Sequence, residues 1–172
     1  YLNSDEKIRI DANRGYTEKE GCNFVKSIDP FGIELFEQPC DSDNWQANSN
    51  VANLSKIPIM LDEPICNLKD IERASKIEGV RYCKLKLKRF CSVELLKEAI
   101  IFGHKKGIKI VLGDGLGGEI NCWMEAKISN NLILNAGEFN GFMKIKNNFS
   151  YLKNPLKFNN GYLTIKENWY PK

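Results

Sequence analysis

Short apolar runs recur along the chain at nearly even intervals. They lie at 7–11 (KIRID), 33–37 (IELFE), 58–62 (PIMLD), 80–86 (VRYCKLK), 108–113 (IKIVLG) and 132–138 (LILNAGE). Their last residues are 26, 25, 24, 27 and 25 positions apart, a regularity typical of a β/α repeat. Runs that are apolar nearly throughout suit parallel strands covered on both faces. The pattern therefore predicts an α/β fold with six β/α units over 1–144.

Helix signals lie between the runs. Thr17 and Glu20 have the spacing of a capping box ahead of Phe24. A second helix is predicted from Ser92, because apolar residues follow at helical spacing and Gly107 comes after a basic end. The tail is rich in Asn, Pro and aromatic residues. It predicts an irregular extension over 145–172, with a short strand at 162–166, packed on the main domain or on an absent capping domain.

Two architectures fit parallel β/α units, a doubly wound sheet and a (β/α) barrel. The first strand is followed by DANRGYT, which lacks the G-x-G-x-x-G turn of nucleotide-binding sheets, so the barrel is favoured. A complete barrel has eight units and about 250 residues, so a partial TIM-type barrel of strands 3 to 8 is predicted. An open arc would leave two unpaired edges. With no initiator Met, the start of a longer protein is expected to be missing.

Composition narrows the function classes. The 172 residues are 42% hydrophobic and 27% charged, which is ordinary for a globular domain. The net charge of +3 comes without a basic stripe, so nucleic acid is not an expected partner. No apolar run approaches the roughly 20 residues of a membrane span, and no signal sequence opens the chain. A cytoplasmic location without a membrane partner is expected.

Cysteine and histidine usage predicts neither a zinc site nor a disulfide framework. The six cysteines form no C-x-x-C pair, and His104 is the single histidine. Scattered, small, buried thiols are expected instead. His104 stands late in a predicted helix, where a helix-end or surface role is favoured over catalysis.

Acidic residues end three successive predicted strands: Asp11, Glu37 and Asp62. Active sites of parallel barrels lie at the carboxyl ends of the strands, so these carboxylates are expected to converge at the barrel mouth. Carboxylate oxygens with water and substrate oxygens suit Mg²⁺. A single strand-end acid would be interpreted as a helix cap or surface charge, but three in successive units favour a metal site.

Lysines follow on the next predicted strand. Lys84, Lys86 and Lys88 share one face by the two-residue period of a strand. A run of lysines usually marks a solvated edge, yet a strand covered on both sides has only the barrel interior for such residues. At least one lysine is therefore expected at the mouth, where an amine near a metal can act as a base.

These motifs also resemble a known family. DANRGYT, FEQP, LDEP and KLKLK, at these spacings over about 7–143, are similar to the barrel of the mandelate racemase and muconate lactonizing enzyme group of the enolase superfamily. The likeness is to the muconate lactonizing enzyme-like subgroup. It implies that Asp11, Glu37 and Asp62 bind Mg²⁺, that Asn13 stands beside the first, and that Lys86 is the acid/base lysine of the sixth strand.

Lys86 is chosen over its neighbours by position. In the subgroup the lysine stands five residues before a Gly-Gly pair, and here Cys91 and Ser92 take the place of that pair. This departure leaves the shape of the loop open.

Four further residues are expected behind the metal ligands or against the substrate: Glu63, Lys84, Asp114 and Glu138. Asp114 begins a glycine-rich turn before a predicted helix, whose free N–H groups could hold an anion, although glycines there could equally serve close packing. Glu138 lies where relatives often place acids that meet a substrate ammonium group.

The resemblance implies abstraction of a proton α to a carboxylate, with Mg²⁺ stabilising an enediolate. A racemase or epimerase of amino-acid or dipeptide-like substrates is the first hypothesis. A lyase or cycloisomerase, such as an o-succinylbenzoate synthase or muconate cycloisomerase, is the second, and a catalytically incomplete fragment the third. The partner is a small-molecule carboxylate, and whether the protein is a homo-oligomer stays open. Relatives carry a second lysine in a K-x-K strand expected before Tyr1, so this chain alone is expected to be inactive.

Overall fold

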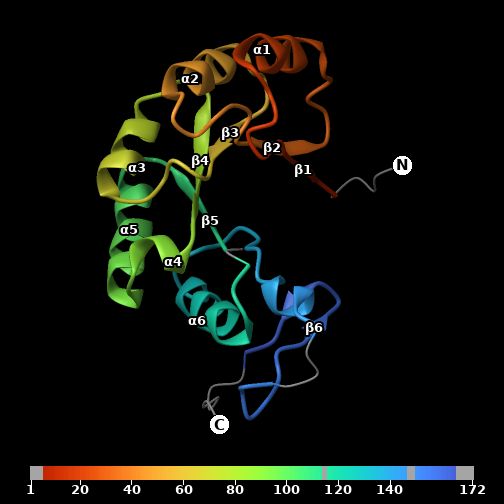
Figure 1. The fold of residues 1–172 in the computed structure, drawn as a ribbon, viewed down its shortest axis with the longest axis vertical. Helices are drawn as coiled ribbons and strands as arrows, with labels where there is room; N and C mark the ends of the chain where they lie inside the picture. The colour runs from red at the N-terminus through yellow and green to blue at the C-terminus, as the bar shows by residue number, and fades with distance from the viewer. Residues whose placement is uncertain (1–5, 114–115, 147–149, 166–172) are drawn as a thin grey trace. The chain divides into compact units, whose positions relative to one another are not determined.

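The fold is built on a parallel sheet, and a helix follows each of its strands along the chain. The computed structural model describes residues 6–113, 116–146 and 150–165 (Figure 1). The sheet has the order β1-β2-β3-β4-β5, and neighbouring strands from β1 to β4 pair in parallel. The strands are β1 (Ile8–Asp11), β2 (Ile33–Glu37), β3 (Ile59–Leu61), β4 (Val80–Leu85) and β5 (Lys109–Leu112).

The helices confirm the alternation that the spacing predicted. They are α1 (Glu18–Ser27), α2 (Trp45–Leu54), α3 (Leu68–Ser75), α4 (Leu87–Phe90), α5 (Val93–Lys105), α6 (Glu119–Ser129) and the 3₁₀ turn η1 (Gly141–Lys144). Thr17 and Glu20 form the predicted capping box, with Thr17 N donating to Glu20 Oε2 at 2.9 Å. Gly107 follows α5 with a φ of 77°, a left-handed conformation that suits glycine.

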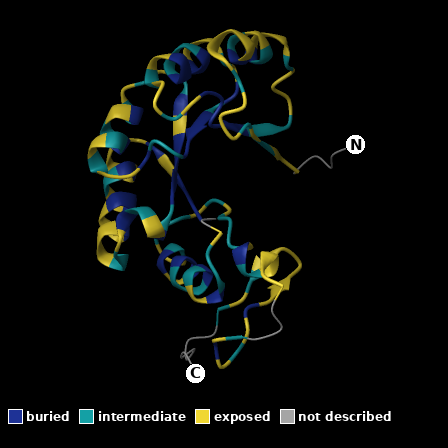
Figure 2. Cartoon of the chain, in the orientation of Figure 1, coloured by how far each residue is buried: buried dark blue, intermediate teal, exposed yellow. Residues whose placement is uncertain are grey.

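The chain divides into two compact units. The first runs up to Lys84 and includes Phe102–Ile110, whereas the second comprises Leu85–Ile101 and the described residues from Val111 onward. Inside the first unit Leu35, Phe36, Ile59 and Leu61 are fully buried, as Figure 2 shows for the strand region. Consecutive strand residues are thus covered on both faces, which is why these runs lack polar alternation.

Two strand predictions need correction. No strand forms over 132–138, where Glu138 makes only an isolated parallel bridge to Gly113 and Leu134 is fully exposed. The run is apolar in sequence, but none of its side chains is buried, so over the described residues the sheet has five strands rather than six. In the tail, β7 (Tyr162–Leu163) is shorter than predicted and pairs antiparallel with β6 (Phe158–Asn159), while residue 166 lies outside the described residues.

The cysteines are free thiols, as expected, but not all are buried. Cys40, Cys83 and Cys122 are buried, whereas Cys66 and Cys91 are exposed, which corrects the expected burial. His104 is exposed in the last turn of α5, which confirms its predicted place. Over the described ranges, none of the helices has the length and apolar content that a membrane span requires.

Candidate metal and acid/base site

The sheet places the three predicted acids at the carboxyl ends of adjacent strands. Asp11 and Glu37 are direct partners in the register of β1 and β2, and Asp62 follows β3 immediately. Glu37 is 3% exposed and Asp62 5% exposed, whereas Asp11 is open to solvent. Because β1, β2 and β3 are neighbours, their parallel ends bring the acids to one edge of the first unit.

The turn after β1 holds Asp11 in place. Its carboxylate accepts hydrogen bonds from Asn13 N at 2.9 Å and from Asn13 Nδ2 at 3.0 Å. Asn13 has a φ of 45°, and Ala12 N donates to Glu37 O at 3.0 Å, so the turn continues onto the end of β2. Asn13 therefore stands beside the first acid, as the motif predicted.

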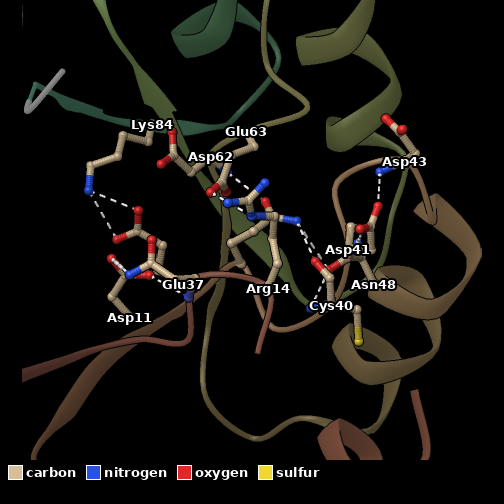
Figure 3. Close-up of polar contacts among 12 residues, drawn as sticks. Asp11, Arg14, Glu37, Cys40, Asp41, Asp43, Asn48, Asp62, Glu63 and Lys84 are labelled. Atoms are coloured by element: carbon tan, nitrogen blue, oxygen red, sulfur yellow. Dashed lines mark hydrogen bonds and ion pairs between the residues drawn. The ribbon is translucent and has the colours of Figure 1, made fainter. Parts of the chain in front are cut away.

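A buried lysine contacts the middle acid. Lys84 Nζ lies 2.8 Å from Glu37 Oε1 and 3.1 Å from Oε2, and the two side chains are 5% and 3% exposed (Figure 3). Burial raises the pKa of Glu37 to about 7; the Lys84 ammonium opposes this rise, and the charges of Asp11 and Asp62 add to it. The three carboxylates are thus close enough to influence one another.

Sequence reasoning missed a buried amide network behind the acids. Gln38 is fully buried with a φ of 37°, and its Oε1 accepts from Asp62 N at 2.9 Å. Its Nε2 donates to Cys40 O at 3.0 Å and to Asn48 Oδ1 at 3.4 Å, which ties the end of β2 to helix α2. The available signals were a glutamine between a strand-end Glu and Pro39, and an asparagine among the apolar residues of a helix.

Glu63 joins two of the turns at this edge. Its Oε1 lies 3.1 Å from Arg14 Nε, and the Glu63 side chain is 21% exposed. Arg14 N also donates to Gln38 O at 2.9 Å. The turn after β1 and the residue after Asp62 are therefore linked by charge.

Lys86 and Glu138 belong to the second unit. Lys86 directly follows β4 with extended backbone (φ −133°, ψ 127°), and its side chain is half-buried. Glu138 is half-buried, and its N–H donates to Leu112 O at 2.9 Å. Asp114 lies outside the described residues.

The loop after α4 keeps a backbone shape that glycine would favour. Cys91 has a φ of 63° and ends this one-turn helix, with its N–H donating to Leu87 O at 3.0 Å. The replacement of glycine by cysteine therefore leaves a left-handed residue in the loop.

The donor set fits Mg²⁺ in its chemistry, since three carboxylates offer hard oxygen ligands and two of them are buried. Over the described ranges, however, no three Asp, Glu, His or Cys side chains stand close enough to hold a metal ion as they are. The cation in contact with Glu37 is the Lys84 ammonium. Metal binding would thus require the side chains to rearrange.

Fold and acids together define a partial (β/α) barrel with a strand-end carboxylate site. A family model described as enolase C-terminal domain-like matches residues 2–168, and the chain belongs to this family, which confirms the resemblance in its motifs. The muconate lactonizing enzyme from Pseudomonas putida has the same fold: the TM-score is 0.85 at 19% identity, covering 99% of this chain and 48% of that one.

Curated relatives agree with the family. The chain is 28% identical over 111 residues to an L-amino acid-D/L-Glu epimerase of Sulfurimonas denitrificans, covering 64% of this chain and 33% of that protein. It is 25% identical over 107 residues to a chloromuconate cycloisomerase of Cupriavidus pinatubonensis, covering 62% and 29%. The chain spans about a third of the length of these relatives, and both are isomerases by name.

Proposed function

We propose that the protein, at its full length, moves a proton at the carbon α to a carboxylate and epimerises amino-acid or dipeptide-like substrates. The observation that carries this proposal is the line of three acids at adjacent strand ends, with Lys84 of β4 in contact with the middle acid. Lys86 follows β4 directly in the chain. The similarity to an epimerase supports the choice of reaction.

Asp11, Glu37 and Asp62 would hold Mg²⁺. When bound, the ion supplies a Lewis acid that favours negative charge on the substrate carboxylate. Asn13 keeps the Asp11 carboxylate directed by its two hydrogen bonds. Gln38 fixes the backbone of Asp62 from behind.

Lys86 is the proposed base. Its amine takes the proton from Cα, so the C–H bond breaks, an N–H bond forms, and the electron pair is shared with the substrate carboxylate. Return of the proton by Lys86 regenerates the starting configuration. Inversion needs a second acid on the opposite face, which we assign to the K-x-K strand expected from the rest of the protein.

Deuterium incorporation tests the proposal directly. The full-length protein with Mg²⁺ in D₂O is expected to place deuterium at Cα of a dipeptide such as L-Ala-L-Glu, and Lys86→Ala is expected to lower the rate by about 10² or more. Lys88→Ala is the matched control, because Lys88 is exposed two residues further on. No exchange across a panel of amino acids and dipeptides, with the metal present, would refute the proposal.

A cycloisomerase is the alternative that a specific observation favours, since both the chloromuconate cycloisomerase and the muconate lactonizing enzyme match this chain. Here Lys86 would exchange a proton with a carbon next to a lactone carboxylate. Lactone formation from a muconate, with no deuterium in recovered dipeptide, would select this reaction over epimerisation.

A further inference from the structure

Lys84 is the buried cation of this edge, and it contacts the same oxygens that a metal would use. Its Nζ reaches both oxygens of Glu37, at 2.8 and 3.1 Å. The side chains of this pair are nearly removed from solvent. A divalent ion bound by Glu37 would need at least one of those oxygens.

The charges around Glu37 explain why a cation is needed there. Asp11 and Asp62 each disfavour its ionisation, and burial does so more strongly. Removing a carboxylate from water without a compensating charge is expensive, so the ammonium stabilises an acid that two further acids surround.

Lys84 differs from the proposed base, Lys86, in its position along the chain and in its burial. It lies within the strand, where it is 4% exposed, whereas Lys86 follows the strand end and is half-buried. Lys84 is thus the more buried of the two lysines.

We propose that Lys84 is the resident counter-cation of the site: its ammonium occupies Glu37 in the metal-free protein and must withdraw before a divalent cation can bind there. Lysine and metal then compete for one carboxylate. This inference rests on the proposed function only in taking Glu37 as a metal ligand. It predicts that Lys84 weakens metal affinity and keeps the empty site folded.

The opposite role would be a lysine that orients Glu37 toward the metal. In that case the metal would bind more weakly without Lys84. The two roles therefore predict opposite changes in metal affinity when Lys84 is replaced.

Mn²⁺ binding to the full-length protein, followed by electron paramagnetic resonance of the free ion, measures the direction of this change in affinity. Lys84→Met is expected to bind Mn²⁺ on the order of tenfold more tightly than wild type, because a buried like charge next to the ion is removed. The exposed control Lys88→Met is expected to match wild type. Unchanged or weaker binding by Lys84→Met would overturn the inference.

A ligand variant and an NMR measurement complete the test. Glu37→Gln is expected to lose most Mn²⁺ affinity; if it binds like wild type, the ligand assignment in the proposed function fails, whereas a failure confined to Lys84→Met sinks only the competition. If Lys84→Met does not fold, the ¹⁵Nζ resonance of Lys84 in the wild-type protein decides. We expect Mg²⁺ saturation to shift it, and an unmoved resonance would contradict displacement.

Discussion

Buried glutamates lie in both units, but their surroundings differ. Glu37 in the first unit contacts the Lys84 ammonium and lies close enough to Asp11 and Asp62 for their charges to act on it. Glu119 in the second unit is 9% exposed and accepts hydrogen bonds from groups of the tail. The donors are Ser150 Oγ, Tyr151 N, Leu152 N and Leu156 N, at 2.6 to 3.3 Å.

The groups that surround a buried carboxylate separate an anchoring acid from a reactive one. A carboxylate that accepts several backbone N–H groups has its charge and lone pairs satisfied, so it holds a segment in place. A buried carboxylate that feels the charge of two further acids is compensated only in part by one ammonium, so it favours an added cation. Burial alone would have assigned both glutamates the same role.

The largest effect is expected from removing the anchor. Glu119→Ala leaves buried N–H donors of the tail without their acceptor, which should destabilise the described tail by about 4 kcal/mol, at about 1 to 3 kcal/mol for each lost partner. Hydrogen exchange at Tyr151, Leu152 and Leu156 measures the loss. Glu98→Ala, at an exposed position in α5 of the same unit, is the matched control. Retained protection in Glu119→Ala would show that the tail does not depend on this carboxylate.

A smaller, pH-dependent effect is expected at the reactive acid. Burial raises the pKa of Glu37 from 4.5 to about 7, so the folded protein keeps this proton at pH values where the unfolded chain has released it. Stability is therefore expected to fall as pH rises from about 4.5 to about 7, and then to level off. The loss is about 3 to 4 kcal/mol, at about 1.4 kcal/mol per pKa unit.

Urea unfolding in EDTA over this pH range measures the fall. Glu37→Gln, which cannot ionise, should remove it. Glu34→Gln on the same strand serves as the control, because Glu34 pairs with Arg9 on a more exposed part of β2. Identical pH profiles for wild type and Glu37→Gln would assign the dependence to another group.

The same contrast shows what sequence could predict. Strands β1 to β4 were predictable because apolar runs end at even steps, the first three of them on Asp11, Glu37 and Asp62. The run at 132–138 looked similar, but burial depends on which elements cover a segment, and the sequence does not record this. Leu134 is accordingly exposed.

The residues of the candidate site could be predicted from the sequence, but their contacts could not. Strand alternation put Lys84 and Lys86 on one face, yet it could not show that Lys84 of β4 would contact Glu37 of β2 across the intervening strand β3. Gln38 was visible in the FEQP motif, but its hydrogen bond to Asp62 N depends on how the turns after β2 and β3 meet.

The smallest effect is expected at Cys91, a left-handed residue of the second unit that contrasts with Asn13 of the first. Asn13 in the first unit has a φ of 45° and uses its side chain to bind Asp11, so glycine there would lose a functional contact. Cys91 in the second unit has a φ of 63° and is exposed, and its Sγ lies 4.0 Å from Arg89 O. Cys91→Gly is expected to raise the free energy of unfolding by about 1 kcal/mol, because glycine adopts this conformation without a Cβ clash. Urea unfolding measures this gain. Cys91→Ala is the control, because it removes the sulfur but keeps Cβ and so isolates the backbone effect. A Cys91→Gly variant no more stable than Cys91→Ala would contradict the prediction.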